Sequence, residues 1–565
     1  MDVRADAILR RHGAMVGERG IWHSHWQEIA ERVLPRAATF ITQSTAGDKR
    51  TEKLFDATAP MALERYAAAV ESLIMPRNET WHGFEPADED IREDHECKLW
   101  CDELTKLVFR VRYLPQSAFS SQGQEALMSL GAFGTAGMMV DNALNYPSLS
   151  RNPAPIVYRA QPLDSMYIME NAAGQVDTVH RELELDARQA VQQFSLDGDR
   201  LPGKIKDAAE KGDPRKWSFV HAVNPANDTG PWQYEKSEKG WSIEATARFH
   251  SCYVSRDDMT VVRTSGYTAM PYAVSRNVTA PRETYGRSPA MSVLPDIKMI
   301  NEVAKTTIRG AQKAVDPPLL LADDGTGAPI DMTPGAANYG HVDSQGRVLA
   351  HPFIQGGRFD VAKEVRQDLR SSINSAFLVT LFQILVENKQ MTAYEAALRA
   401  QEKGILLAPT MGRQETELLA PMVERELDIL WDRGIIQRYL PPMPRRMLER
   451  GGVLKLVYTS PLARLAKAAE SVAVQKWIAG IGSIAAVSPG VVDNVDFDAC
   501  ATIIADAEGV PAKARRSPEE VLAIRQKKDE QANAQLMLQA APIAAATAKD
   551  ASAAAANAAA APMPA

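Results

Sequence analysis

The sequence has few cysteines, no excess of positive charge and no long run of apolar residues. Its four cysteines (Cys97, Cys101, Cys252 and Cys500) make no disulfide framework and suit a reducing cytoplasm. The formal net charge is -7, whereas wrapping nucleic acid by neutralising phosphates needs a basic face. The N-terminus lacks the apolar segment of a secretory signal, and no apolar run of about 18 residues occurs. These absences argue against secretion, membrane spanning and nucleic-acid wrapping.

The composition is otherwise that of an ordinary soluble globular protein. Hydrophobic residues make up 45% and charged residues 24% of the 565 positions, which allows about three or four domains. Helical spacing and short β-like runs between Gly, Pro and Asn predict an α+β body that is predominantly α-helical. The predicted helices are 8–34, 62–75, 93–112, 122–133 and 187–194, and the predicted strands are 137–140, 156–159, 166–170, 176–185, 246–254, 260–263 and 272–276.

Two long amphipathic helices dominate the next part of the chain. Apolar residues recur at steps of three and four from Pro295 to Val315 and again from Asp360 to Leu385. Asp360 stands where an N-cap is expected. At 1.5 Å per residue each helix is about 30 to 40 Å long. Because a Pro- and Gly-rich β insert separates them, we predict an antiparallel helical stalk with a β tip.

The remaining chain is again mostly helical in pattern. A polar interruption, VENKQM at 386–391, precedes a long helical pattern from Met391 to Tyr439. Kinks are expected inside it near Gly404, Pro409, Gly412 and Pro421. A strand at 453–458 and helices at 463–479, 496–507 and 518–537 follow. Residues 539–565 are alanine-rich, and composition leaves open whether they are frayed or helical.

Two segments resemble catalytic motifs but lack residues that the motifs require. Gly198 to Lys204 has the spacing of a phosphate-binding loop, but Ile205 replaces the Ser or Thr that binds magnesium and Pro202 removes an amide donor. Gly286 to Ala290 lacks the last glycine of a nucleophile elbow and contains a blocking proline. A turn into the stalk is the better interpretation of the second segment.

Candidate metal ligands are equally incomplete. His95, Cys97 and Cys101 lie on one predicted helix without a second ligand pair nearby, and His180-x-Glu182 lacks the downstream cysteines of a zinc deaminase. In the cluster Trp22, His23, His25 and Trp26, the two histidines point to different helix faces, so packing by the tryptophans is favoured. No catalytic constellation, metal site or cofactor site is predicted, and we expect a structural protein rather than an enzyme.

One run of residues closely resembles a family signature. Tyr285 to Gly325, YGRSPAMSVLPDIKMINEVAKTTIRGAQKAVDPPLLLADDG, resembles the head-to-tail connector, or portal, proteins of short-tailed bacteriophages. Further similar segments follow in the same order at Pro334 to Ala336, Met391 to Arg425 and Tyr458 to Arg464, and Ser72 to Pro86 is similar upstream. The resemblance spans about residues 1–530 and leaves out the alanine-rich tail.

The resemblance implies a portal fold with named parts. Portal proteins form rings, usually of about twelve copies, at one capsid vertex, with DNA passing through the central channel. By position, the implied parts are a wing (1–284), stem helices (285–316 and 359–385), a β-containing clip (317–358), a tunnel loop (386–391), a long kinked helix returning through the wing (392–439) and a helical crown (440–538).

The resemblance also implies partners and contact residues. The partners are other copies of the chain, a terminase motor, a tail adaptor at the clip, major capsid and scaffolding proteins, and double-stranded DNA that is not read by sequence. The protein would be assembled in the host cytoplasm. It would then be part of the virion, at the portal vertex of the capsid. Twelve copies at -7 each carry about -84, so DNA meets little net attraction.

Two groups of residues are the candidate contacts. Asn388, Lys389 and Gln390 are candidates for the channel lining, with a solvated interhelix turn as the alternative. Charges on the first stem helix are candidates for pairing between subunits: Lys298, Glu302, Lys305 and Arg309.

Two other functions stay open at this point. The first is a tail or adaptor scaffold without a DNA channel. The second is a nucleotide-dependent hydrolase that uses the loop from Gly198 to Lys204. The width of the lumen tests the first, and ATP turnover that is lost in Lys204→Ala tests the second.

Overall fold

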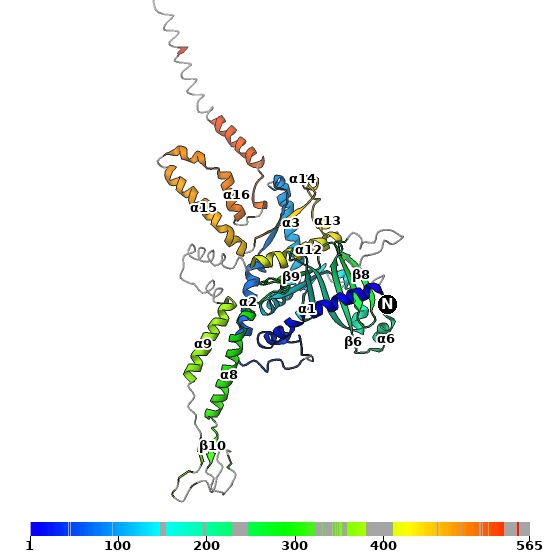
Figure 1. The fold of residues 1–565 in the computed structure, drawn as a ribbon. Helices are drawn as coiled ribbons and strands as arrows, with labels where there is room; N and C mark the ends of the chain where they lie inside the picture. Colours follow the sequence, from blue (N-terminus) through cyan, green and yellow to red (C-terminus); the bar gives the residue numbers. More distant parts are fainter. Residues whose placement is uncertain are drawn as a thin grey trace, which may run out of the picture.

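Figure 1 shows the chain in a computed structural model, a mixed helix-and-strand body with a long arm on one side. The structure describes residues 2–42, 45, 47–92, 94–146, 154–195, 199–228, 247–315, 317–321, 330–331, 342, 345, 347–348, 350–352, 359–379, 411–459, 461–485, 488–507, 510, 512–517, 519–535 and 551–552. The predicted 386–391 loop and most of the alanine-rich tail lie outside these residues.

The body begins with four helices and a small three-stranded sheet. The helices are α1 (Val3–Val33), α2 (Thr58–Ile74), α3 (His95–Arg112) and α4 (Phe119–Phe133). The antiparallel strands β2 (Thr135–Asn142), β3 (Ile156–Gln161) and β9 (Tyr272–Arg276) form a sheet in the order β3-β2-β9. Helix α4 contacts both α2 and the strands β2 and β3. All four predicted helices are confirmed, each beginning within about five residues of its predicted start.

A second, five-stranded antiparallel sheet lies beside this unit. Its strands follow the chain in order: β4 (Met166–Glu170), β5 (Val176–Asp186), β6 (Lys216–Pro225), β7 (Phe249–Ser255) and β8 (Thr260–Tyr267). The helices α5 (Ala187–Gln193) and α6 (Gly203–Lys211) connect β5 to β6 and share a small core with Phe219 and Tyr253. The sequence analysis missed β6 and α6, although Trp217 and Phe219 alternate with polar residues as strand residues do.

The arm consists of the two predicted helices. After the short helix α7 (Pro289–Ser292), α8 covers Leu294–Val315, and α9 covers Phe359–Ala376. Between them, β10 (Leu319–Leu321) pairs with β11 (Ala350–Pro352) in antiparallel fashion. Two details of the second prediction were wrong. Asp360 lies in the first turn and not at the N-cap, and the helix ends nine residues before Leu385 because Leu378 adopts a left-handed φ of 57°.

The predicted long helix after the arm is interrupted in its described part. A π-helical turn at Glu415–Leu419 directly precedes α12 (Ala420–Asp432), whose second residue is Pro421. Since proline has no N–H to donate to the preceding turn, the irregularity expected near Pro421 takes the form of this π-helical turn, and the chain stays helical on both sides of it. The helix breaks at Gly434, with φ 65°, which separates α13 (Ile435–Tyr439) and was not predicted. The expected kinks at Gly404 and Pro409 lie outside the described residues.

The C-terminal part returns once to the body and then leaves it. After α14 (Arg445–Glu449), β12 (Leu454–Tyr458) pairs antiparallel with β1 (His82–Pro86). Then α15 (Pro461–Ala485) and α16 (Phe497–Ala507) form a hairpin on the side of the body opposite to the arm (Figure 1). Residues 519–535 are helical. These elements confirm the predicted strand and helices, with α15 extended at both ends.

A charged pair lies in the centre of the main core. Arg112 of α3 donates from Nε to Glu426 of α12 at 3.0 Å, and both side chains are fully buried. The Tyr158 hydroxyl donates to the same carboxylate at 2.6 Å, and His82 lies 2.7 Å from the guanidinium. The Trp81 ring stacks on the guanidinium with its centre 4.5 Å away. This cluster joins α3, α12, β1 and β3.

Three buried histidines make stability depend on pH. Burial, with Arg112 nearby, lowers the pKa of His82 well below 6.5. Burial beside His12 lowers the pKa of His180 to about 3, and burial near Arg181 lowers the pKa of His221 well below 6.5. Below pH 6.5 these histidines bind protons in the unfolded chain and not in the folded one, so acid favours unfolding.

We expect stability to be highest above pH 7 and to fall as the pH drops below about 6.5, by up to about 1.4 kcal/mol per pH unit for each histidine. Calorimetric unfolding at pH 7.5 and 5.5 measures the loss. The variant His180→Gln should show a shallower pH slope than the unsubstituted chain. An unfolding free energy that is the same at both pH values would contradict the expectation.

Candidate functional site

The apolar stripe of the arm is only partly covered within one chain. Near the body, Ile297, Ile300 and Ala304 of α8 are buried. Farther out, Ile308 is 48% exposed and Val315 is 87% exposed, although both continue the same stripe at helical spacing. On α9, Val361 and Val365 are also exposed. Apolar side chains repeated along an exposed helix mark a surface that a partner covers.

The start of the arm, at the entry to α7, is fixed by close contacts with the backbone of the body. The Ser288 hydroxyl caps α7 and donates to the Ala132 carbonyl at 2.8 Å. Gly134, with φ 77°, approaches Gly286 so closely that an added Cβ would lie 2.4 Å from the Gly286 carbonyl oxygen. Only glycine fits that conformation and contact. The predicted turn into the stalk is therefore confirmed, and Ser288 serves as a helix cap.

Further contacts hold both arm helices to α2 and its leading loop. The side-chain amide oxygen Oδ1 of Asn301 on α8 accepts from the backbone N–H groups of Phe55 and Asp56, at 2.7 and 3.0 Å. Asp56 in turn accepts from Arg370 of α9 at 2.7 Å. Phe377, fully buried, packs edge-on against Tyr66. Residues far apart in the sequence thus clamp the arm to the body.

Three of the four predicted stem charges form ion pairs inside the chain. Lys298 pairs with Glu28 of α1 at 2.6 Å. Lys305 pairs with Glu302 on its own helix at 3.4 Å and lies over the Phe55 ring. Arg309 is exposed. Their pairing between subunits therefore stays a prediction.

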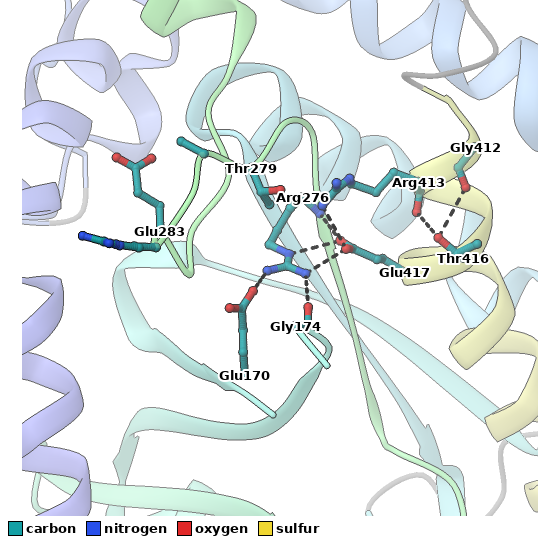
Figure 2. A pocket seen from close by; sticks show the side chains of 11 residues that line it. Glu170, Gly174, Arg276, Thr279, Glu283, Gly412, Arg413, Thr416 and Glu417 are labelled. Carbon is teal, nitrogen blue, oxygen red and sulfur yellow. Dashed lines mark hydrogen bonds and ion pairs between the residues drawn. The ribbon is translucent and has the colours of Figure 1, made fainter. Parts of the chain in front are cut away.

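A second charged node, around Arg276, borders an open pocket of about 640 Å³. Figure 2 shows the Arg276 guanidinium between Glu170 and Glu417. It also donates to the Gly174 carbonyl at 2.9 Å, and its own backbone N–H donates to Glu417 at 2.9 Å. Since the guanidinium is almost completely buried and both carboxylates face it, the node ties β9, the β4–β5 turn and the π-helical turn together.

The sequence analysis missed both Arg276 and Arg112. Arg276 ends a five-residue strand whose members are all buried, and Glu426 lies within the apolar stripe of α12. A charge inside an apolar pattern indicates a buried partner. That signal could have singled out Arg276 and Glu426, but not the partner of either residue.

The variant Arg276→Lys is expected to lower the unfolding free energy by about 2–4 kcal/mol, because lysine cannot reproduce the several fixed hydrogen bonds of the guanidinium. Arg413→Lys is the matched control. Arg413 borders the same pocket and pairs with Glu417 at 3.3 Å, but it is 36% exposed, so its change should stay within about 1 kcal/mol. Urea unfolding measures both, and equal losses would contradict the special role of Arg276.

Comparison with known proteins identifies the family. A family model described as bacteriophage head to tail connecting protein matches residues 5–515. The chain belongs to this family. The "Probable portal protein" of Bordetella phage BPP-1 is 28% identical over 545 residues, which cover 93% of this chain and 91% of that protein. The "Portal protein" of Salmonella phage epsilon15 is 26% identical over 542 residues, covering 94% and 92%.

Among solved structures, a chain from the "Virion of native gene transfer agent (GTA) particle" matches this connecting protein with 12% identity and a TM-score of 0.30. The match covers 74% of this chain and 98% of the other. No helix within the described part of the connecting protein is long and apolar enough to cross a membrane.

The near-motifs have structural roles in this connecting protein. Lys204 pairs with Asp258 and lies over the Trp217 ring. Its ammonium group, which a phosphate would need, therefore already has partners within the chain. Cys97 and Cys101 are buried, and burial raises the pKa of both thiols, to about 11 and about 12. Within the described ranges, no group of three potential metal ligands comes together. Trp22 and Trp26 stack with ring centres 5.3 Å apart, which confirms the packing interpretation.

Proposed function

We propose that this chain is the portal protein of a bacteriophage: a ring subunit at one capsid vertex, through which the genome enters and leaves and on which the tail is built. Membership of the connector family carries the proposal, together with portal proteins as relatives over nearly the full length. The arm supports it physically, because an apolar stripe left open in one chain is closed when copies stand side by side.

In this proposal each part of the chain is assigned to one region of the portal ring. Residues 1–284 form the wing, α8 and α9 belong to the stem, and the β10–β11 region belongs to the clip that meets a tail adaptor. The β12–α16 region belongs to the crown, inside the capsid. Lys298, Glu302, Lys305 and Arg309 lie on the α8 surface offered to neighbouring copies. Asn388, Lys389 and Gln390 would line the channel.

The assembly acts as a conduit, and a separate terminase supplies the work. Double-stranded DNA passes without being read, and capsid and scaffolding proteins surround the ring. The proposal assigns no catalytic step to this chain. Its charged groups serve as hydrogen-bonded ties within the body, as Arg112 and Arg276 do.

Native mass measurement and electron microscopy of the purified protein test the proposal. We expect closed rings of a single stoichiometry with a lumen wide enough for duplex DNA. A stable monomer at physiological salt would overturn the proposal. Rings whose lumen is too narrow for duplex DNA would replace it with a tail or adaptor scaffold.

A further inference from the structure

Helix α15 carries two apolar stripes on neighbouring faces. The first consists of Val474, Ile478, Ile481 and Ala485, and the second of Ala473, Trp477, Gly480 and Ile484. Both follow steps of four, three and four, which is the spacing that meets another helix. A helix that is apolar over most of its circumference belongs in an interior.

Only the first stripe is covered in the single chain. Ile481 is buried together with Val495 and Cys500, and Val474, Ile478 and Val491 pack against them. This small core lies between α15, α16 and the turn at Pro489–Asn494. Among the hairpin residues whose burial the structure describes, these three buried apolar side chains are few for a hairpin that projects from the body (Figure 1). Such a hairpin needs a further contact to hold one arrangement.

The second stripe is open. Trp477 is 47% exposed and Ile484 is 52% exposed, and Ala473 and Gly480 between them are also exposed. Trp477 alone leaves roughly 100 Å² uncovered, since a tryptophan buries roughly 150–250 Å² when enclosed. The small residues Ala473 and Gly480 would let a second helix approach closely.

We infer that the stripe formed by Ala473, Trp477, Gly480 and Ile484 is an assembly contact, covered in the ring by the hairpin of the neighbouring copy. The inference rests on the proposed ring. Continuity with the arm supports a second copy as the occupant, because α15 contacts α2 and α2 contacts α9, the returning arm helix. Figure 1 shows the arm and the hairpin projecting from opposite ends of the same body, so neighbouring copies that pack side by side would bring both into contact.

A pair of cysteine variants tests whether a neighbouring copy covers the stripe, without disturbing assembly. Gly480→Cys lies in the open stripe, and Gly482→Cys lies on the opposite side of α15. An added Cβ at either glycine has no atom within 4 Å, and the four natural cysteines are buried. In assembled rings, a maleimide should label Cys at position 480 at least about tenfold more slowly than at 482, while dissociated subunits label both at similar rates.

The labelling rates have clear contrary outcomes. Equal rates in the ring would overturn the inference while leaving the ring itself established. Slow labelling at position 480 in dissociated subunits as well would show that the chain covers its own stripe, which also overturns it. If the unsubstituted chain forms no ring, the proposed function fails first, and native mass shows this directly.

A charge-matched pair tests the energetic contribution of the stripe. Trp477→Glu with Ile484→Glu places two carboxylates in the stripe, and Gln475→Glu with Ser483→Glu adds the same charge away from it. The first double variant should lower the fraction of chain in rings at least about tenfold, and the second should leave it unchanged. Circular dichroism of dissociated subunits controls for folding. Rings of normal yield from the Trp477 and Ile484 variant would overturn the inference.

Discussion

Replacing Glu426 by glutamine is expected to destabilise the folded subunit by about 3–5 kcal/mol, because it leaves the Arg112 guanidinium charged, fully buried and without a counter-ion. The carboxylate also accepts from Tyr158, so the change weakens two hydrogen bonds at once. Urea unfolding of the purified subunit measures the loss. Because the pair joins α3 to α12, we expect the whole body to unfold rather than one helix.

The exposed pair on the same helix α3 provides the control. Glu103 pairs with Lys106 at 2.7 Å, and both side chains are about half exposed, so Glu103→Gln should change stability by less than about 1 kcal/mol. The double variant Arg112→Met with Glu426→Met removes both charges and should recover part of the loss. If Glu426→Gln and Glu103→Gln give the same midpoint, burial of the pair does not have the assigned effect.

Placing a carboxylate on the open stripe of the arm should prevent rings from forming. Val315→Glu is the clearest variant, since Val315 is 87% exposed and touches little of its own chain, so the subunit should fold normally. Each interface would lose the burial of an aliphatic side chain, about 1.5–3 kcal/mol, and would enclose an unpaired charge. We expect the ring fraction in native mass measurements to fall at least about tenfold, and Ile308→Glu to act in the same direction.

Gln367→Glu is the matched control for the arm. Gln367 is exposed on the face of α9 opposite to Val365 and Leu369, so it adds the same charge to the arm without entering the apolar stripe or the charged face of α8. Its ring fraction should equal that of the unsubstituted chain. Equal losses in Val315→Glu and Gln367→Glu would indicate a general charge effect and not a covered stripe.

Local patterns predicted most elements of the fold because they act over a few residues. The strands β4 and β9 have their predicted bounds, and α8 differs from its prediction by one residue. Helix α9 was predicted too long because its apolar spacing continues past Leu378, and no local rule places a leucine in a left-handed conformation. The pairing of β1 with β12 joins segments more than 350 positions apart, which periodicity cannot indicate.

The site was predictable only in outline. The stripe of the arm and the connector-like run at its start indicated a structural surface, and family membership agrees with it. The anchoring groups could not be predicted in the same way. Arg112 and Glu426 lie 314 positions apart, and Asn301 reaches the backbone at Phe55 across 246 positions. Such pairs depend on how whole elements pack, which a single sequence does not specify.

The double anchoring of the arm has a mechanical consequence. Helix α8 is fixed through Ser288 and Asn301, and α9 is fixed through Arg370 and through Phe377 directly after its end, all near the junction with the body. A force applied at the tip along the arm runs parallel to both helices, so these contacts are loaded together in shear and do not peel apart one after another. A ring of such arms would transmit axial load from its tip to the body through many weak contacts in parallel.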